Sequence, residues 1–235
     1  MTARYDAVSD SYARRPDEYD HPALEALLAR LDGATGEALD LACGHGLVTR
    51  ELARRGLSTV GIDISTSLVA HAVGHEVREP LGITYEVGDV SDARVLEGRT
   101  FDVVVCHFGL SDIDDLEGVM ATVSAALRPG GRFVFSILHP CFIGTSDVSG
   151  SWPPETSYYD ERWWRAEGEL STLRRVVGAN HRMVSSYLNA VTDRGLSIRH
   201  IDEPPPEPDW TTTRPAAATQ PVYLVVDCRK DDTLA

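Results

Sequence analysis

A glycine-rich turn is the first place in this sequence where chemistry could be concentrated. Residues Leu39 to Thr49 read LDLACGHGLVT, in which a short apolar run leads into Gly44, His45 and Gly46. A helical pattern follows the turn, and backbone amides at a helix N-terminus attract an anionic group. Glycine also lets a ligand approach the backbone where a Cβ atom would clash. The turn could therefore hold the phosphates of a dinucleotide or the carboxylate end of S-adenosylmethionine.

Two acidic residues follow this turn at later strand ends. Asp63 ends the apolar run TVGID, and Asp89 follows the run ITYEVG. A carboxylate at the position of Asp63 accepts hydrogen bonds from ribose hydroxyls. A carboxylate at the position of Asp89 can accept a hydrogen bond from the exocyclic amine of adenine. The turn lacks the third glycine of the dinucleotide pattern G-x-G-x-x-G, because Thr49 stands there. These residues predict an adenosine-type ligand and leave its identity open.

Three histidines are candidate proton acceptors. His107 follows a predicted strand, His139 opens a long aromatic segment, and His181 closes that segment. A histidine in a cleft can remove a proton from a hydroxyl or an amine. It can equally make a structural hydrogen bond, so the sequence leaves both roles open for each of them.

Alternating strand and helix signals must position these residues. Apolar runs predict strands at 37–42, 58–64, 83–89, 101–110, 132–138, 196–204 and 220–230. Helical spacing predicts helices at 21–32, 47–56, 65–74, 115–131 and 183–195, the fourth ending at Pro129 and two glycines. The run VVVC is apolar at consecutive positions, as in a parallel strand buried on both faces. The alternation predicts an α/β fold with a doubly wound, mostly parallel sheet.

Two segments depart from this rhythm and are expected to cover the sheet edge. Residues 1–20 carry Tyr5, Tyr12 and Tyr19 at a seven-residue spacing, which places all three on one face if the segment is helical. Residues 139–180 are long and aromatic for a connector, as binding loops are. We expect one domain over 1–235, with a helical cover at 1–32 and a substrate-covering insertion at 139–180. The aromatic side chains expected to wall the substrate site are Trp152, Tyr158, Tyr159, Trp163 and Trp164.

The overall composition disfavours several classes of function. The 235 residues carry a formal net charge of −14, which would repel a polyanion, so no DNA partner is expected. One basic strip, Arg162, Arg165, Arg174 and Arg175, is a local exception. The four cysteines are widely spaced, which argues against a zinc site and a disulfide framework. A secretory h-region and an apolar run long enough for a membrane span are both missing, so we expect a cytoplasmic protein.

Five segments in order make the chain resemble the class I S-adenosylmethionine-dependent methyltransferase family. They are ALDLACGHGLVT, VGIDIS, YEVGDV, FDVVVCHFGLSDI and LRPGGRFVFSI. The resemblance covers roughly residues 36–138, together with the last helix and the last two strands. It implies a seven-stranded sheet of order 3-2-1-4-5-7-6 with an antiparallel last strand, and S-adenosylmethionine as the cofactor, with no metal.

The resemblance also implies roles for individual residues. Gly44 and Gly46 would hold the methionine part, Asp63 the ribose, and Asp89 with Val90 the adenine. Asp40 would support the turn or the cofactor amino group, and His107 would face the sulfonium. The remaining expected cofactor-binding positions are Tyr5, Tyr12, Ala42 and Ile64.

The function implied is methyl transfer to an oxygen or nitrogen of a small molecule. A base is needed when the acceptor arrives protonated, and His139, His181 and His107 are the candidates. The same fold could bind the cofactor without transferring methyl, as a cyclase-like or non-catalytic protein, and an RNA or protein acceptor is a further alternative. An N/D-P-P-aromatic segment typical of DNA amino-methyltransferases is missing after the fourth strand, and so is the Y-x-x-x-K pair of short-chain reductases after the fifth. The acceptor's identity, the methylated atom and the oligomeric state stay open.

Overall fold

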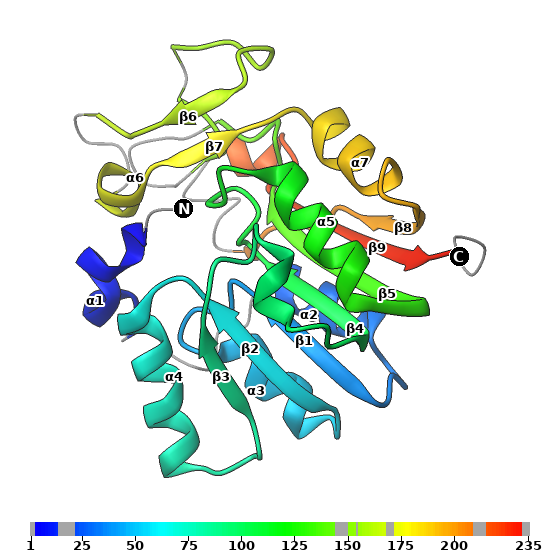
Figure 1. The fold of residues 1–235 in the computed structure, drawn as a ribbon. Helices are drawn as coiled ribbons and strands as arrows, with labels where there is room; N and C mark the ends of the chain where they lie inside the picture. The colour runs from blue at the N-terminus through cyan, green and yellow to red at the C-terminus, as the bar shows by residue number, and fades with distance from the viewer. Residues whose placement is uncertain are drawn as a thin grey trace.

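A seven-stranded sheet of order β3-β2-β1-β4-β5-β9-β8 forms the centre of the computed structural model (Figure 1). The structure describes residues 3–13, 22–143, 150–153, 155–167, 172–208 and 215–231. The strands are β1 (Glu37–Leu41), β2 (Ser58–Asp63), β3 (Thr84–Val87), β4 (Phe101–His107), β5 (Leu127–Leu138), β8 (Leu196–Asp202) and β9 (Tyr223–Lys230). The first five are parallel, and β9 is antiparallel to both β5 and β8. The predicted strand order 3-2-1-4-5-7-6 is confirmed.

Helices cover both faces of the sheet (Figure 1). One face packs on α2 (Pro22–Arg30) and α3 (Leu47–Arg54), and the other on η2 (Ala93–Leu96), α5 (Leu116–Ala126) and α7 (Val184–Thr192). Strand β4 shows why its sequence is apolar at consecutive positions. Val103 and Val105 belong to the core under α2 and α3, whereas Val104 and Cys106 belong to the core under α5 and α7.

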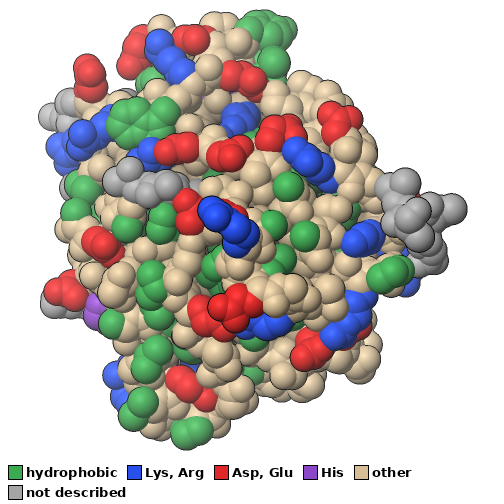
Figure 2. All heavy atoms as spheres, viewed as in Figure 1, with side chains coloured by type: hydrophobic (Ala, Val, Ile, Leu, Met, Phe, Trp, Pro, Cys, Tyr) green, Lys and Arg blue, Asp and Glu red, His purple; other side chains and the backbone are tan. Residues whose placement is uncertain are grey.

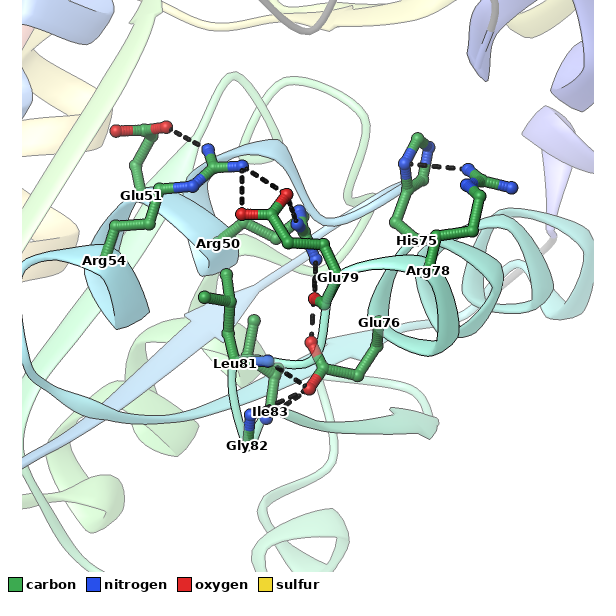
Figure 3. Close-up of polar contacts among 10 residues, drawn as sticks. All are labelled: Arg50, Glu51, Arg54, His75, Glu76, Arg78, Glu79, Leu81, Gly82 and Ile83. Atoms are coloured by element: carbon green, nitrogen blue, oxygen red, sulfur yellow. Dashed lines mark hydrogen bonds and ion pairs between the residues drawn. The ribbon is translucent and has the colours of Figure 1, made fainter.

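Helix α4 (Thr66–Arg78) continues past the predicted end at Gly74. The predicted start is confirmed, because the Ser65 side chain accepts a hydrogen bond from the Leu68 amide. The end was wrong because Gly74 lacks the left-handed backbone of a C-cap glycine. The chain instead turns beyond Arg78, where Glu76 Oε1 accepts hydrogen bonds from the amides of residues 81–83 (Figure 3).

Helix α5 ends at Ala126, earlier than the predicted end at Pro129. Leu127 is already extended, with ψ of 135°, and it pairs with Phe101 of β4. A residue before proline avoids helical backbone, so Arg128 cannot continue the helix easily. The turn that follows uses Gly130 with φ of 71° before β5 resumes its pairing with β4.

The two departing segments lie at the carboxyl end of the parallel strands (Figure 1). Within 139–180, β6 (Arg162–Trp164) pairs antiparallel with β7 (Ala179–His181), and α6 (Thr172–Val177) lies between them in the sequence. The N-terminal segment forms η1 (Arg4–Val8) and α1 (Ser9–Ala13), and η1 contacts both α4 and α6. A last short helix, η3 (Pro215–Ala218), precedes β9.

The charged surface is mixed in sign. Acidic and basic side chains alternate across the face shown in Figure 2 without a large area of one charge. In the described parts of the chain, no helix combines the length and apolar character that a membrane crossing requires.

Candidate functional site

The glycine turn joins β1 to α3, and its two glycines differ in how closely they are packed. Gly44 and Gly46 both have left-handed backbone, with φ of 56° and 90°. A Cβ atom on Gly46 would lie 2.4 Å from Tyr85 Oη, whereas one on Gly44 would have its nearest neighbour, Tyr12 Cε1, at 3.9 Å. The first helical hydrogen bond runs from Arg50 N to Gly46 O. The first amides of α3 therefore lack partners within the helix and can bind an anionic group.

Asp63 connects the end of β2 to this turn. Its Oδ2 atom accepts a hydrogen bond from the Gly44 amide, and Oδ1 accepts one from the Ser65 amide, each at 2.8 Å. Burial raises the pKa of Asp63, and the two amide hydrogen bonds oppose that rise. Each carboxylate oxygen keeps further acceptor capacity, so the expected bond to ribose hydroxyls stays a prediction that the geometry permits.

Asp40 lies beneath the turn, buried between β1 and α3. Its Oδ2 atom accepts a hydrogen bond from Thr49 Oγ1 at 2.6 Å. Burial raises the pKa of Asp40 to about 7, the Thr49 hydroxyl opposes this, and the nearby Asp63 adds to it. This position supports the turn from below, which is one of the two roles expected for Asp40.

The expected adenine side lies after β3. Asp89 Oδ1 accepts hydrogen bonds from the amide and the hydroxyl of Ser91, at 2.9 and 2.6 Å. Val90 is buried and Ile64 is half-buried. Ala42, at the start of the glycine turn, has left-handed backbone with φ of 55° despite its Cβ atom.

The two parts of the predicted cover at 1–32 lie in different places. In the first part the Tyr5 and Tyr12 rings are in contact at 5.1 Å, and the Tyr12 ring lies 5.7 Å from that of His45 in the glycine turn. Helix α2 instead packs against β5 and β9 as part of a helix layer. Tyr19 lies outside the described residues.

A partly buried polar cluster that the sequence analysis missed joins the N-terminal segment, the loop after β4 and α6. Asp112 accepts hydrogen bonds from Tyr5 Oη at 2.8 Å and from Arg174 Nη1 at 2.5 Å. The Arg174 guanidinium also donates to Gly178 O at 2.8 Å. Burial raises the pKa of Tyr5 well above its usual value, and the Asp112 charge adds to the rise. A usable signal was present, because Asp112 follows the fourth strand as Asp63 and Asp89 follow the second and third.

The basic strip of the sequence is not a continuous surface. Arg174 is buried in this cluster, and the Arg165 guanidinium donates to the carbonyl oxygen of Arg175. Arg162 forms an ion pair with Asp160 at 3.2 Å. Each of these three arginine side chains thus has a bonding partner within the chain.

In two of the three candidate histidines, His107 and His139, ring nitrogens contact other side chains or backbone amides of the protein. His107 lies at the end of β4, with Nδ1 2.6 Å from Ser136 Oγ. His139 accepts a hydrogen bond at Nδ1 from the Cys141 amide, and its Nε2 lies 3.0 Å from Glu203 Oε1. Burial lowers the pKa of His139, and Glu203 opposes this. Because both ring nitrogens are engaged, proton transfer at His139 would first require breaking one of these contacts.

His181 differs because one ring nitrogen is available. Its Nε2 atom lies 2.8 Å from the carbonyl oxygen of Tyr158, so Nε2 carries the hydrogen. Among the described residues Nδ1 has no hydrogen-bond partner, although the atom is buried. Burial also lowers the pKa of His181. The neutral ring therefore presents a lone pair at Nδ1.

Comparisons with known proteins agree with this geometry. A family model described as a methyltransferase domain matches residues 39–135. The ubiquinone biosynthesis O-methyltransferase of Xanthomonas axonopodis pv. citri is 28% identical over 172 residues, which cover 70% of this chain and 71% of that protein. An S-adenosylmethionine-dependent methyltransferase structure from Mesorhizobium loti is 28% identical with a TM-score of 0.69, covering 92% of this chain and 99% of that one. A glycopeptide N-methyltransferase complexed with S-adenosylmethionine shares the fold at 18% identity, with a TM-score of 0.59, covering 92% and 96% of the two chains.

Proposed function

The chain belongs to the class I S-adenosylmethionine-dependent methyltransferases, and from this we propose that it methylates an oxygen or a nitrogen of a small molecule. The methyltransferase relative in Xanthomonas axonopodis pv. citri carries O-methyltransferase in its name. The aromatic insertion above the sheet edge, with Trp152 and Trp164 buried in it, is suited to a compact apolar acceptor. The face shown in Figure 2 carries charges of both signs and no broad basic area of the kind that an RNA acceptor would favour.

The glycine turn and the strand ends fit the cofactor. Bound S-adenosylmethionine supplies a methyl group on a sulfonium, whose C–S bond breaks with its electron pair going to sulfur as the acceptor bonds to the methyl carbon. We propose that the first amides of α3 hold the methionine carboxylate, with Gly44 giving close access and Asp63 accepting the ribose hydroxyls. The further proposed cofactor contacts are Tyr5, Tyr12, Asp40, Ala42, Gly46, Ile64, Asp89, Val90 and His107.

The observation that carries this proposal is the contrast between the two glycines. A Cβ atom at Gly46 would collide with Tyr85, so packing requires a glycine there, whereas a Cβ atom at Gly44 would meet only the Tyr12 ring, at 3.9 Å. The same turn carries the Gly44 amide, which donates to Asp63, and leads into the first amides of α3, which lack partners within the helix. Backbone donors and a buried carboxylate at one sheet edge match a ligand with an anionic end and a diol.

The chain's own contribution to methyl transfer is expected to be positioning and proton acceptance. The neutral thioether released from a sulfonium is a good leaving group, so the protein mainly has to align the acceptor atom with the methyl group. A protonated acceptor also needs a base, and His181 is the candidate with an available ring nitrogen. His107 and His139 stay proposed alternatives, each with the hydrogen bonds described above.

The test combines cofactor binding with a product assay. Calorimetry should detect S-adenosylmethionine binding to the wild-type protein, and Gly44→Val should abolish it by filling the space beside Gly44. Gly82→Val is a matched control, because Gly82 also has left-handed backbone but lies outside the turn. Formation of S-adenosylhomocysteine with small phenols, alcohols or amines would support the proposal. Cofactor binding without product from any such acceptor would contradict it and favour a non-transferring protein or a macromolecular acceptor.

A further inference from the structure

Trp152 and His181 lie together above the carboxyl ends of β5 and β4. Ser151, next to Trp152, donates from its hydroxyl to the carbonyl oxygens of residues 138–139 at the end of β5. Asn180, next to His181, donates from its amide to the loop after β4 at 2.7 Å. The carboxyl end of parallel strands is where ligands bind in open α/β sheets. Both residues are therefore anchored to the edge of the sheet at which an acceptor must approach.

Each of the two rings carries a buried polar atom that lacks a partner within the described chain. Trp152 is 9% exposed and His181 is 2% exposed, and their ring centroids are 5.6 Å apart. Trp152 Nε1 can only donate a hydrogen bond. His181 Nδ1 can only accept one, because Nε2 donates to the Tyr158 carbonyl oxygen. Burying an unpaired donor and an unpaired acceptor is costly, and both are found in the same ring contact.

We propose that Trp152 and His181 form a binding site for a hydroxyl group of the methyl acceptor, an inference that rests on the proposed function. A hydroxyl donates one hydrogen bond and accepts others, so it satisfies both ring nitrogens at once. An ammonium group has donors only and would leave Trp152 Nε1 unpaired. An ether has acceptors only and would leave His181 Nδ1 unpaired. The pair thus favours a hydroxyl over an ether or a protonated amine.

The surroundings favour a phenol over an alkyl alcohol. The rings of Trp152 and Tyr158 flank His181, at 5.6 and 5.7 Å, and offer flat apolar surfaces to an aromatic acceptor. Burial lowers the pKa of His181, which makes it a weak proton acceptor. A phenol, with a pKa of about 10, gives up its proton far more readily than an alkyl alcohol, whose pKa is much higher. The phenol O–H bond breaks, the proton passes to His181 Nδ1, and the oxygen keeps the electron pair.

Two substitutions isolate the two polar atoms. His181→Gln keeps a donor for the Tyr158 carbonyl oxygen but removes the acceptor at the Nδ1 position. Trp152→Phe keeps an aromatic ring and removes the Nε1 hydrogen. Thr59→Val is a matched control, because Thr59 Oγ1 is another buried atom without a partner in the described chain, and it lies on β2 rather than in this pair.

The experiment measures binding rather than turnover, with phenol, anisole and benzylamine as probes in the presence of S-adenosylhomocysteine. Phenol should bind the wild-type protein more tightly than anisole or benzylamine do, and it should shift the ¹⁵N resonance of His181 Nδ1. Each of His181→Gln and Trp152→Phe should weaken phenol binding by about 3- to 10-fold, the effect of one lost hydrogen bond. Thr59→Val should bind phenol as the wild-type protein does.

Several outcomes would overturn the hydroxyl site. Two of them concern the probes: anisole binds as tightly as phenol, or benzylamine binds more tightly than phenol. The others are that phenol binding is unchanged in both His181→Gln and Trp152→Phe, or that phenol does not shift the Nδ1 resonance. An unshifted resonance is expected if only water occupies the pair. Failure of the proposed function is distinguishable. Phenol binding at the pair without methylation of any small molecule would refute the function, whereas methylation of amines alone would refute only the hydroxyl site.

Discussion

Replacing Asp40 by asparagine should change how the stability of the protein depends on pH. Asp40 is 2% exposed, and burial raises its pKa from 3.8 to about 7 in the folded protein. The rise is about 3 pKa units, and each unit corresponds to about 1.36 kcal/mol of difference between the protonation states. Ionising Asp40 in the folded protein therefore costs on the order of 4 kcal/mol of unfolding free energy.

The direction of the effect follows from proton binding. Below pH 3.8 the carboxyl group is protonated in both the folded and the unfolded chain, and no cost is present. Between about pH 4 and pH 7 the unfolded chain releases this proton while the folded protein keeps it, so stability falls as pH rises. Above pH 7 the whole cost is present. Asparagine does not titrate and still offers an amide oxygen to the Thr49 hydroxyl.

Urea unfolding between pH 4 and pH 8 measures this effect. The unfolding free energy of wild type minus that of Asp40→Asn should fall by about 4 kcal/mol across this range. Asp32→Asn is the control for the loss of one acidic group, since the Asp32 side chain is mostly exposed and pairs with Arg55 at the surface. A constant difference between Asp40→Asn and wild type would refute the reasoning, because it would mean that the buried carboxyl group does not titrate differently after folding.

Three further substitutions test the turn and its surroundings. Gly46→Ala should lower thermal stability more than Gly82→Ala, because both strain left-handed backbone by about 1–2 kcal/mol but only Gly46 would also place a Cβ atom 2.4 Å from Tyr85 Oη. Glu76→Ala should lower the free energy of unfolding, measured by chemical denaturation, by about 2–3 kcal/mol, because it removes the acceptor of three backbone amides (Figure 3). Glu76→Gln keeps the acceptor oxygen and should lower the free energy of unfolding clearly less. Asp63→Ala should weaken S-adenosylmethionine binding by about 1–3 kcal/mol in calorimetry, and unchanged affinity would remove Asp63 from the cofactor site.

The sheet was predictable from the sequence because its signals are local. Most of the parallel strands are apolar runs bounded by turn residues, and the VVVC run of β4 indicates burial on both faces, which its two cores confirm. Helix ends were less predictable. Gly74 resembled a helix stop, but the end of α4 depends on Glu76 reaching amides that come later in the chain. The early end of α5 depends on the pairing of Leu127 with Phe101, which no local pattern shows.

The same distinction holds for the candidate site. Asp63 could be placed beside the glycine turn because parallel strands end at one edge, and its bond to the Gly44 amide agrees with that placement. The bond between Asp112 and Arg174 joins residues 62 positions apart, and it depends on how the insertion folds back. The free nitrogen of His181 was likewise invisible, because only the carbonyl oxygen of Tyr158 determines which tautomer the ring adopts.

The two covers are fastened to the sheet edge by different kinds of contact, which gives them a different response to salt. β7 is fixed by hydrogen bonds that Asn180 donates from its side chain and backbone to the loop beyond β4, and these bonds are buried or partly buried. The N-terminal segment is held partly by exposed contacts, which are the Arg4–Asp114 ion pair at 2.6 Å and the Asp10–His71 hydrogen bond at 3.1 Å. Dissolved ions screen exposed pairs more strongly than buried bonds. Raising the ionic strength should therefore loosen the N-terminal segment before it loosens the attachment of β7 to the loop after β4.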